Sequence, residues 1–191
     1  MLDIKWFLFF NGLHSPFWDT GMWYISATKT WIPLYAVILF FVFKKMKWQG
    51  FVALLFFALL IFFADQGSVK LFKNVFERLR PCHNPEIQHL VHIVNGKCGG
   101  QFGFVSSHAA NTFALAMFTS LFFRKKWVTI SFFVWATVVS YSRIYLGVHF
   151  PFDVICGGLF GVLLGILTFL LYNRTLRYIQ KRKSREKPTL T

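Results

Sequence analysis

Long apolar runs that are almost free of charge constrain this chain more than any other feature. A helix needs about 20 mostly apolar residues to cross the hydrocarbon core of a bilayer, and five stretches qualify: residues 21–43, 50–67, 104–123, 127–147 and 154–172. Only 15% of the residues are charged, against about 25% in soluble domains. We therefore expect an all-α, polytopic transmembrane helix bundle with about five spans, forming one membrane-embedded domain over residues 1–191. Disorder and a disulfide-rich mini-protein are excluded.

The positive charges indicate which ends of these spans face the cytoplasm. The formal net charge is +14, and most of the 21 Lys and Arg residues follow the first, third and fifth spans. Cytoplasmic loops of membrane proteins carry such an excess. The C-terminus, with a basic tail over residues 173–191, is then inside, and the N-terminus is outside. The charge needs no nucleic-acid partner to explain it.

The first 20 residues are apolar but too short to span. They lack the basic start and small-residue cleavage site of a signal peptide. We expect an interfacial helix over residues 1–20 on the outer leaflet. The alternative is a sixth span, which would reverse only the N-terminus.

The predicted outer loop between the second and third spans contains two of the three cysteines, Cys82 and Cys98. If the loop faces an oxidising compartment, they are free to pair; otherwise they are two thiols. We predict a disulfide, which could stabilise the fold by about 3 kcal/mol in the chain-entropy view. His89 and His92 in this loop have a spacing that could bind zinc on a helical turn, but a solvated loop is the default.

Polar residues that a membrane tolerates poorly cluster at the predicted outer ends of the spans. Cations, hydroxyls, imidazoles and a carboxylate meet there at one depth, and such groups in membrane proteins are usually functional. Lys and Arg bind phosphate oxygens. The helix start at Ser106–Ser107–His108 offers free backbone N–H groups for an anion, with Ser106 as a suitable N-cap. The pattern points to phosphate chemistry.

Two histidines fit the needs of phosphoryl transfer. His149 and Asp153 are spaced i, i+4, so a carboxylate can hold one imidazole nitrogen and leave the other as a nucleophile. His108 is a second imidazole, available as a general acid.

Three motifs carry a resemblance to a known family. Residues 73–81 read KNVFERLRP, which fits K-x6-R-P; residues 106–108 read SSH, close to P-S-G-H; residues 142–153 read SRIYLGVHFPFD, which fits S-R-x5-H-x3-D. In order and spacing they resemble the type 2 phosphatidic acid phosphatase superfamily of integral membrane lipid phosphatases. One departure is that Val105 and Ser107 stand where the family usually has Pro and Gly.

The resemblance implies a role for each matching residue. His149 would form a phosphohistidine, Asp153 would orient it, and His108 would protonate the departing oxygen. The phosphate oxygens would be held by Lys73, Arg80, Ser106, Ser107 and Arg143. No metal and no cofactor are expected.

The function expected from this resemblance is hydrolysis of a lipid phosphate or diphosphate headgroup at the outer leaflet of a bacterial inner membrane, with the site facing the periplasm. Undecaprenyl diphosphate and phosphatidylglycerol phosphate are the leading substrates, and the 1-phosphate of lipid A is the alternative. The expected partners are this substrate and membrane lipids, and an oligomer is not required. A rival of another class is a non-catalytic binder or transporter of lipid phosphates, which would need the cations but not the histidines.

Overall fold

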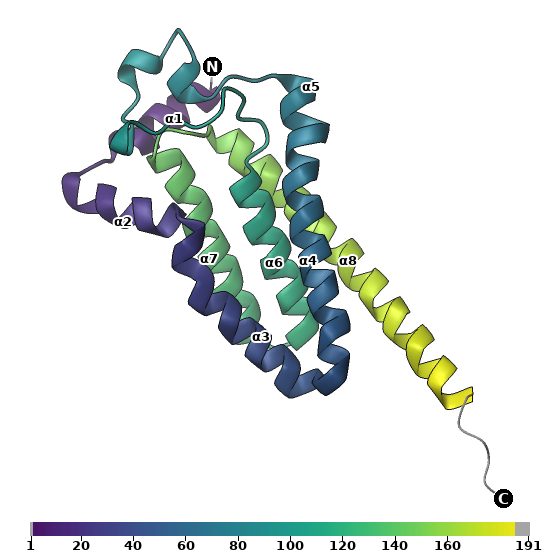
Figure 1. Cartoon of the computed structure of the whole chain (residues 1–191). Helices are drawn as coiled ribbons and strands as arrows, with labels where there is room; N and C mark the ends of the chain where they lie inside the picture. The colour runs from purple at the N-terminus through teal and green to yellow at the C-terminus, as the bar shows by residue number, and fades with distance from the viewer. Residues whose placement is uncertain (1, 186–191) are drawn as a thin grey trace, which may run out of the picture.

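The computed structural model describes residues 2–185, with side chains as far as residue 183. Its helices form an elongated bundle in which α8 (Pro151–Arg185) extends beyond the rest (Figure 1). Within these described residues, three segments are long and apolar enough to cross a membrane: Thr28–Phe76, Lys126–Tyr145 and Pro151–Lys183. The long helices of the first segment are α3 (Ile32–Met46) and α4 (Gly50–Gly67), which are joined by a short turn. The predicted all-α transmembrane architecture is confirmed.

The central helix is α6 (Ser107–Phe123), which lies between α4, α7 (Lys126–Tyr145) and α8 (Figure 1). Small side chains such as Ala110 and Ala114 are fully buried along it. Gly157 and Gly161 of α8 face it, and a Cβ added at Gly157 would lie 2.6 Å from the carbonyl oxygen of Ser106. Small residues at these positions let two membrane helices approach closely, which fixes the start of α8 against the start of α6.

The four later predicted spans coincide with helices α4, α6, α7 and α8, of which α6 lies outside the three apolar segments named above. The first predicted span does not form one helix. The chain expected to be continuous over 21–43 divides between α2 (Pro16–Ser26) and α3, with Ala27 in an extended conformation and a 3-10 turn at Thr28–Trp31. Pro33 then occupies the first turn of α3, a position that suits proline because no intrahelical N–H bond is lost there.

The N-terminal segment forms two helices, α1 (Leu2–Gly12) and α2, where one interfacial helix was expected. Ser15 caps α2, because its hydroxyl oxygen accepts the N–H of Trp18 at 3.5 Å. Phe7 of α1 is fully buried and packs edge-on against Phe150, with ring centroids 5.3 Å apart. Asn11 donates to the carbonyl oxygen of Tyr145 at 2.8 Å. The first helix therefore docks on the protein, across the ends of α7 and α8.

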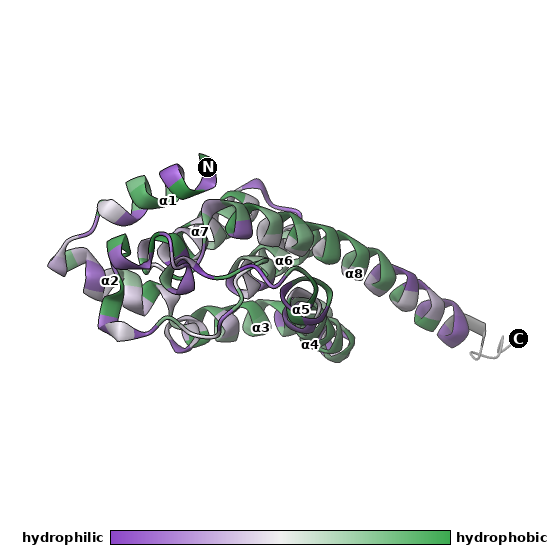
Figure 2. Cartoon of the chain, turned by 90° about the horizontal axis from the view of Figure 1, so that it is seen from above, coloured by the Kyte–Doolittle hydropathy of each residue, from purple (hydrophilic) through white to green (hydrophobic). Residues whose placement is uncertain are grey.

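The turns that follow α3 and α6 lie at one end of the bundle, opposite the N-terminus (Figure 1). In or beside these turns lie the basic residues Lys44, Lys45, Lys47, Arg124, Lys125 and Lys126. Lys45 at the end of α3 donates to the carbonyl oxygen of Phe122 in the last turn of α6, at 2.7 Å. Helix α8 is hydrophobic over its first part and hydrophilic near its end (Figure 2), because the predicted basic tail continues the helix as far as Arg185. The end of the predicted tail, residues 186–191, lies outside the described residues.

Candidate active site

The start of α6 is fixed by hydrogen bonds on both sides of the helix terminus. The hydroxyl oxygen of Ser106 faces the N–H of Ala109 at 3.5 Å, and its own backbone N–H donates to the carbonyl oxygen of Asp153 at 2.9 Å. This places Ser107 and His108 in the first turn, where backbone N–H groups lack helical partners and the helix dipole favours an anion. Ser106 itself acts as the N-cap and is fully buried.

A short π-helical segment, η3 (Ser68–Lys73), brings Lys73 to this terminus. Such segments occur frequently at functional sites. The ammonium of Lys73 donates to the hydroxyl of Ser107 at 2.8 Å. That hydroxyl lies 2.6 Å from the hydroxyl of Ser68, which donates to the carbonyl oxygen of Asp65 at 2.7 Å. Since the proton of Ser68 is used there, Ser107 donates to Ser68, and the side chain that replaces the expected glycine becomes a support for Lys73.

Arg80 reaches the site from the loop that follows α5 (Asn74–Phe76). Its side chain is buried, and its Nη1 lies 3.3 Å from the carbonyl oxygen of Val148 and 3.4 Å from Nε2 of His149. The structure joins Cys82 and Cys98 by a disulfide, with their Cα atoms 6.1 Å apart. The backbone N–H of Arg80 also donates to the carbonyl oxygen of Gln101 at 3.0 Å. Both links hold the loop that carries Arg80.

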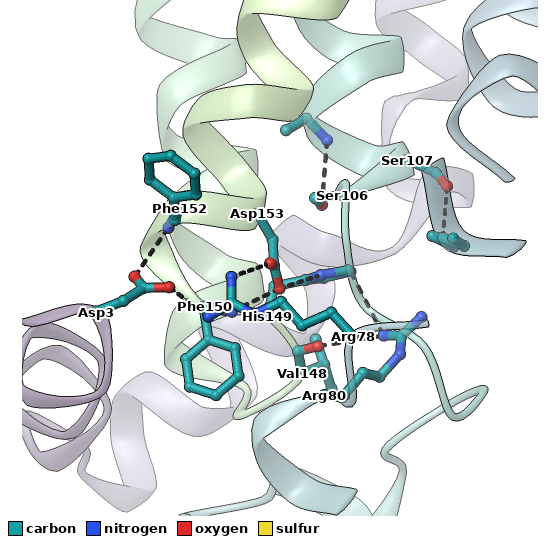
Figure 3. Close-up of polar contacts among 12 residues, drawn as sticks. Asp3, Arg78, Arg80, Ser106, Ser107, Val148, His149, Phe150, Phe152 and Asp153 are labelled. Carbon is teal, nitrogen blue, oxygen red and sulfur yellow. Dashed lines mark hydrogen bonds and ion pairs between the residues drawn. The ribbon is translucent and has the colours of Figure 1, made fainter. Parts of the chain in front are cut away.

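His149 and Asp153 form the pair that their spacing predicts (Figure 3). Nδ1 of His149 lies 3.4 Å from Oδ2 of Asp153, and both side chains are buried. Helix α8 begins at Pro151, so the carboxylate lies in its first turn, and its Oδ2 also accepts the backbone N–H of Phe150 at 3.0 Å. Arg80 can only donate, so Nε2 of His149 is the acceptor and the proton lies on Nδ1.

Burial lowers the pKa of His149 well below its usual range, and the charges of Arg80 and Arg143 lower it further. The imidazole is therefore neutral near pH 7 and keeps a lone pair on Nε2. A nucleophilic histidine needs both properties, together with an orienting partner on the other nitrogen.

Arg143, in the last turn of α7, completes the set of cations. One of its terminal nitrogens donates to the hydroxyl of Ser26 at the end of α2. Within the described part of the chain, the Nε atoms of Arg80 and Arg143 are buried and have no hydrogen-bond partner. Buried polar groups are rarely left unpaired, so two unpaired guanidinium donors beside Lys73 indicate that this pocket receives an anion.

One cavity of ≈ 690 Å³ connects these groups. Its polar end is lined by six of the predicted site residues: Lys73, Arg80, Ser107, His108, Arg143 and His149. Its other end continues between apolar side chains of α3, α4 and α7, among them Ile38, Phe57 and Val139. Ser106 and Asp153 do not line the cavity: Ser106 caps α6, and the carboxylate of Asp153 lies beside Nδ1 of His149. The shape suits a phosphorylated headgroup with hydrocarbon attached.

The zinc alternative at His89 and His92 is not supported by their surroundings. Nε2 of His92 lies 3.1 Å from a carboxylate oxygen of Asp19, and its ring stacks on that of His14 at 3.7 Å between centroids. These contacts join the outer loop to α2 and to the segment that precedes it.

Four residues at the site were not predicted from sequence: Asp3, Ser26, Ser68 and Arg78. Arg78 lies inside the K-x6-R-P segment and donates to Oδ1 of Asp153 at 2.7 Å. Its position between Lys73 and Arg80 indicated that Arg78 lies near the site. Nothing in the sequence showed that its guanidinium contacts the carboxylate of Asp153 rather than a phosphate. The other three have no signal: Asp3 and Ser26 reach the site from distant parts of the chain, and Ser68, five residues before Lys73, belongs to no motif.

Comparison with known proteins decides the family. A family model described as the PAP2 superfamily matches residues 50–177. The chain belongs to the PAP2 superfamily. It is 44% identical over 184 residues to the lipid A 4'-phosphatase of Bacteroides thetaiotaomicron, covering 94% of this chain and 80% of that protein. It is 38% identical to the lipid A 4'-phosphatase of Porphyromonas gingivalis, covering 87% and 71%.

A solved structure has the same fold as this PAP2 protein. It is a transmembrane PAP2-type phosphatidylglycerolphosphate phosphatase from Bacillus subtilis, with 28% identity and a TM-score of 0.63, covering 92% of this chain and 86% of that one. The protein is therefore a multi-pass membrane protein and a lipid phosphatase, as the sequence motifs predicted.

Proposed function

We propose that this PAP2 protein removes a phosphate from lipid A, at the 4' position, through a phosphohistidine on His149. The support for the mechanism is the arrangement of His149, whose acceptor Nε2 lies 3.4 Å from Arg80 in a cavity that Lys73 and Arg143 also line, while Nδ1 lies 3.4 Å from Asp153. The support for the substrate is the 44% identity, over 94% of this chain, to a lipid A 4'-phosphatase. The sequence motifs alone favoured undecaprenyl diphosphate or phosphatidylglycerol phosphate, with the lipid A 1-phosphate as alternative, because they describe only the phosphoryl group.

In the first step the phosphate binds to Lys73, Arg80 and Arg143, with backbone N–H groups at the start of α6. Nε2 of His149 attacks phosphorus, the bond from phosphorus to the lipid oxygen breaks, and the protonated imidazole of His108 gives its proton to that oxygen. The negative charge of the bound phosphate favours this protonated form of His108. In the second step water attacks the phosphohistidine and gives a proton to His108. The nitrogen–phosphorus bond breaks, its electron pair returns to His149, and inorganic phosphate leaves.

We expect phosphate release to survive EDTA, because Lys and Arg provide the positive charge that a metal ion would otherwise supply. The test is phosphate release by the purified protein in excess EDTA. The substrates are lipid A carrying only the 4'-phosphate, lipid A carrying only the 1-phosphate, undecaprenyl diphosphate and phosphatidylglycerol phosphate. The highest kcat/KM should be for the 4'-phosphate, and vanadate should inhibit. Preference for another lipid would overturn the substrate, and loss of activity restored by Zn²⁺ or Mg²⁺ would overturn the metal-free chemistry. Binding without turnover would favour a lipid-phosphate carrier.

We further propose that the site faces the periplasm, with the basic helix ends in the cytoplasm. The Cys82–Cys98 disulfide supports this orientation, since such bonds persist in oxidising compartments. The test is labelling of intact cells with an impermeant thiol reagent, in a Cys156→Ser background. We expect Cys82 and Cys98 to react only after reduction. Labelling of a cysteine introduced at Arg177 in intact cells would reverse the orientation.

A further inference from the structure

The N-terminal helix α1 reaches the catalytic pair through one arginine. Arg78 donates from Nη1 to Oδ1 of Asp153 at 2.7 Å and from Nη2 to Oδ2 of Asp3 at 2.6 Å (Figure 3). The other oxygen of Asp3 accepts the backbone N–H of Phe152, in the first turn of α8, at 3.0 Å. The guanidinium carbon of Arg78 also lies 4.3 Å from the centroid of the Phe150 ring.

The carboxylate of Asp153 divides its two oxygens between different partners. Oδ2 faces Nδ1 of His149 and accepts the N–H of Phe150, while Oδ1 is held by Arg78. Asp153 is fully buried, and a buried carboxylate is costly unless it is paired and hydrogen-bonded. Arg78 supplies that counter-charge. It lies outside the wall of the phosphate cavity, so it is not part of the phosphate-binding set.

Arg78 in turn depends on Asp3 for its orientation. It follows Glu77, which has a left-handed backbone conformation with φ of 45°, in a loop and not within a helix. Its side chain is partly exposed, so a single hydrogen bond would leave the guanidinium free to rotate towards water. The second carboxylate, from Asp3, fixes both terminal nitrogens at once. Asp3 is itself held by the docking of Phe7 on Phe150.

We propose that Arg78 and Asp3 are positioning residues for catalysis, which set the carboxylate of Asp153 so that Oδ2 faces Nδ1 of His149. Asp3 orients Arg78, Arg78 orients Asp153, and Asp153 orients His149. Helix α1, which carries Asp3, is thereby a part of the catalytic apparatus. This inference rests on the proposed function, because it requires His149 and Asp153 to act together in the reaction.

The variants Arg78→Gln and Asp3→Asn test the proposal in the full-length protein, with a lipid phosphate that the wild type hydrolyses. Hydrogen bonds to charged groups are the stronger kind, so we expect Arg78→Gln to lower kcat about 10- to 100-fold. Asp3→Asn keeps an acceptor for the N–H of Phe152 and should lower kcat by about 3- to 10-fold, on the order of one weakened charge-assisted bond. KM should stay within about twofold in both, since neither residue touches the phosphate.

The double variant separates positioning from general damage. If Asp3 acts through Arg78, then Asp3→Asn combined with Arg78→Gln has the same kcat as Arg78→Gln alone, since residues acting as one unit are not additive. Arg78→Lys keeps the charge and should recover part of the lost kcat. The matched controls are Lys5→Gln, exposed on the same helix, and Glu77→Gln, exposed beside Arg78; both should behave as wild type.

Several results would overturn the proposal. The first is a fall in kcat of the double variant equal to the product of the two single falls. The second is a change in KM with kcat unchanged in Arg78→Gln or Asp3→Asn. The third is a fall in kcat of Lys5→Gln as large as that of Asp3→Asn. If Arg78→Gln does not fold, Arg78→Lys and Asp3→Asn decide, and wild-type kcat in both would refute it. Asp153→Asn is the reference. If it stays fully active, the proposed function fails; if it is inactive while Arg78→Gln and Asp3→Asn keep full kcat, only this inference fails.

Discussion

Replacing His149 with alanine should reduce phosphate release by at least about 10⁴-fold, because loss of a covalent nucleophile removes the whole reaction path. The imidazole is buried and lies beside the carboxylate of Asp153, and within the described residues no second imidazole has such a carboxylate neighbour in this cavity. The measurement is initial rates of phosphate release by purified protein, with size-exclusion profiles to establish that the variant is folded.

His89→Ala is the control for this variant, since His89 is exposed in the outer loop and should keep full activity. His149→Gln preserves more of the side-chain volume and should be equally inactive, which separates chemistry from the effect of a cavity in a packed region. A folded His149→Ala protein with wild-type turnover would remove the phosphohistidine mechanism altogether.

The replacement His108→Ala should have the second largest effect, and its size should depend on the leaving group. General acid catalysis typically contributes 10²- to 10⁴-fold, so we expect a loss of about 10³-fold with a phosphate monoester. With a diphosphate the leaving group is itself a phosphate, which needs less protonation than an alkoxide, and we expect a loss of about 10-fold. The measurement is kcat for both substrates with the same variant.

The difference in kcat loss between the monoester and the diphosphate is the decisive result. A variant that merely distorts the first turn of α6 would slow the hydrolysis of both substrates alike. Thr112→Val is a suitable control. Its hydroxyl donates to the carbonyl oxygen of His108 at 2.8 Å, so the change disturbs the same turn without removing the imidazole. Equal losses with the monoester and the diphosphate would assign His108 to binding.

Most of the transmembrane bundle could be predicted from sequence because lipid imposes a strong rule: every backbone polar group must be satisfied within a helix. The apolar run at 50–67 became α4 (Gly50–Gly67) with the same bounds. The prediction of one helix over the first run was wrong at Ala27, where α2 ends and the hydroxyl of Ser26 accepts a hydrogen bond from Arg143. The contact at this break joins residues 117 positions apart, and no local pattern in the sequence contains it.

The same distinction applies to the candidate site. His149 and Asp153 are four positions apart at a helix start, so their meeting follows from helical geometry. The bond between Arg78 and Asp3 spans 75 positions, and that between Ser68 and Ser107 spans 39. Motif spacing therefore predicted the groups proposed to touch phosphate, whereas the groups that hold them in place became visible only when the helices were packed.

Trapping the covalent intermediate tests the proposed mechanism most directly. The wild-type protein and the His149→Ala protein would be mixed with a ³²P-labelled lipid phosphate, quenched in alkali within milliseconds and digested for peptide mapping. The mechanism predicts an alkali-stable, acid-labile label on the peptide containing His149, formed and lost at rates no slower than turnover, and no label in His149→Ala. Phosphate release with no labelled intermediate at any time, or a label that persists in His149→Ala, would contradict it.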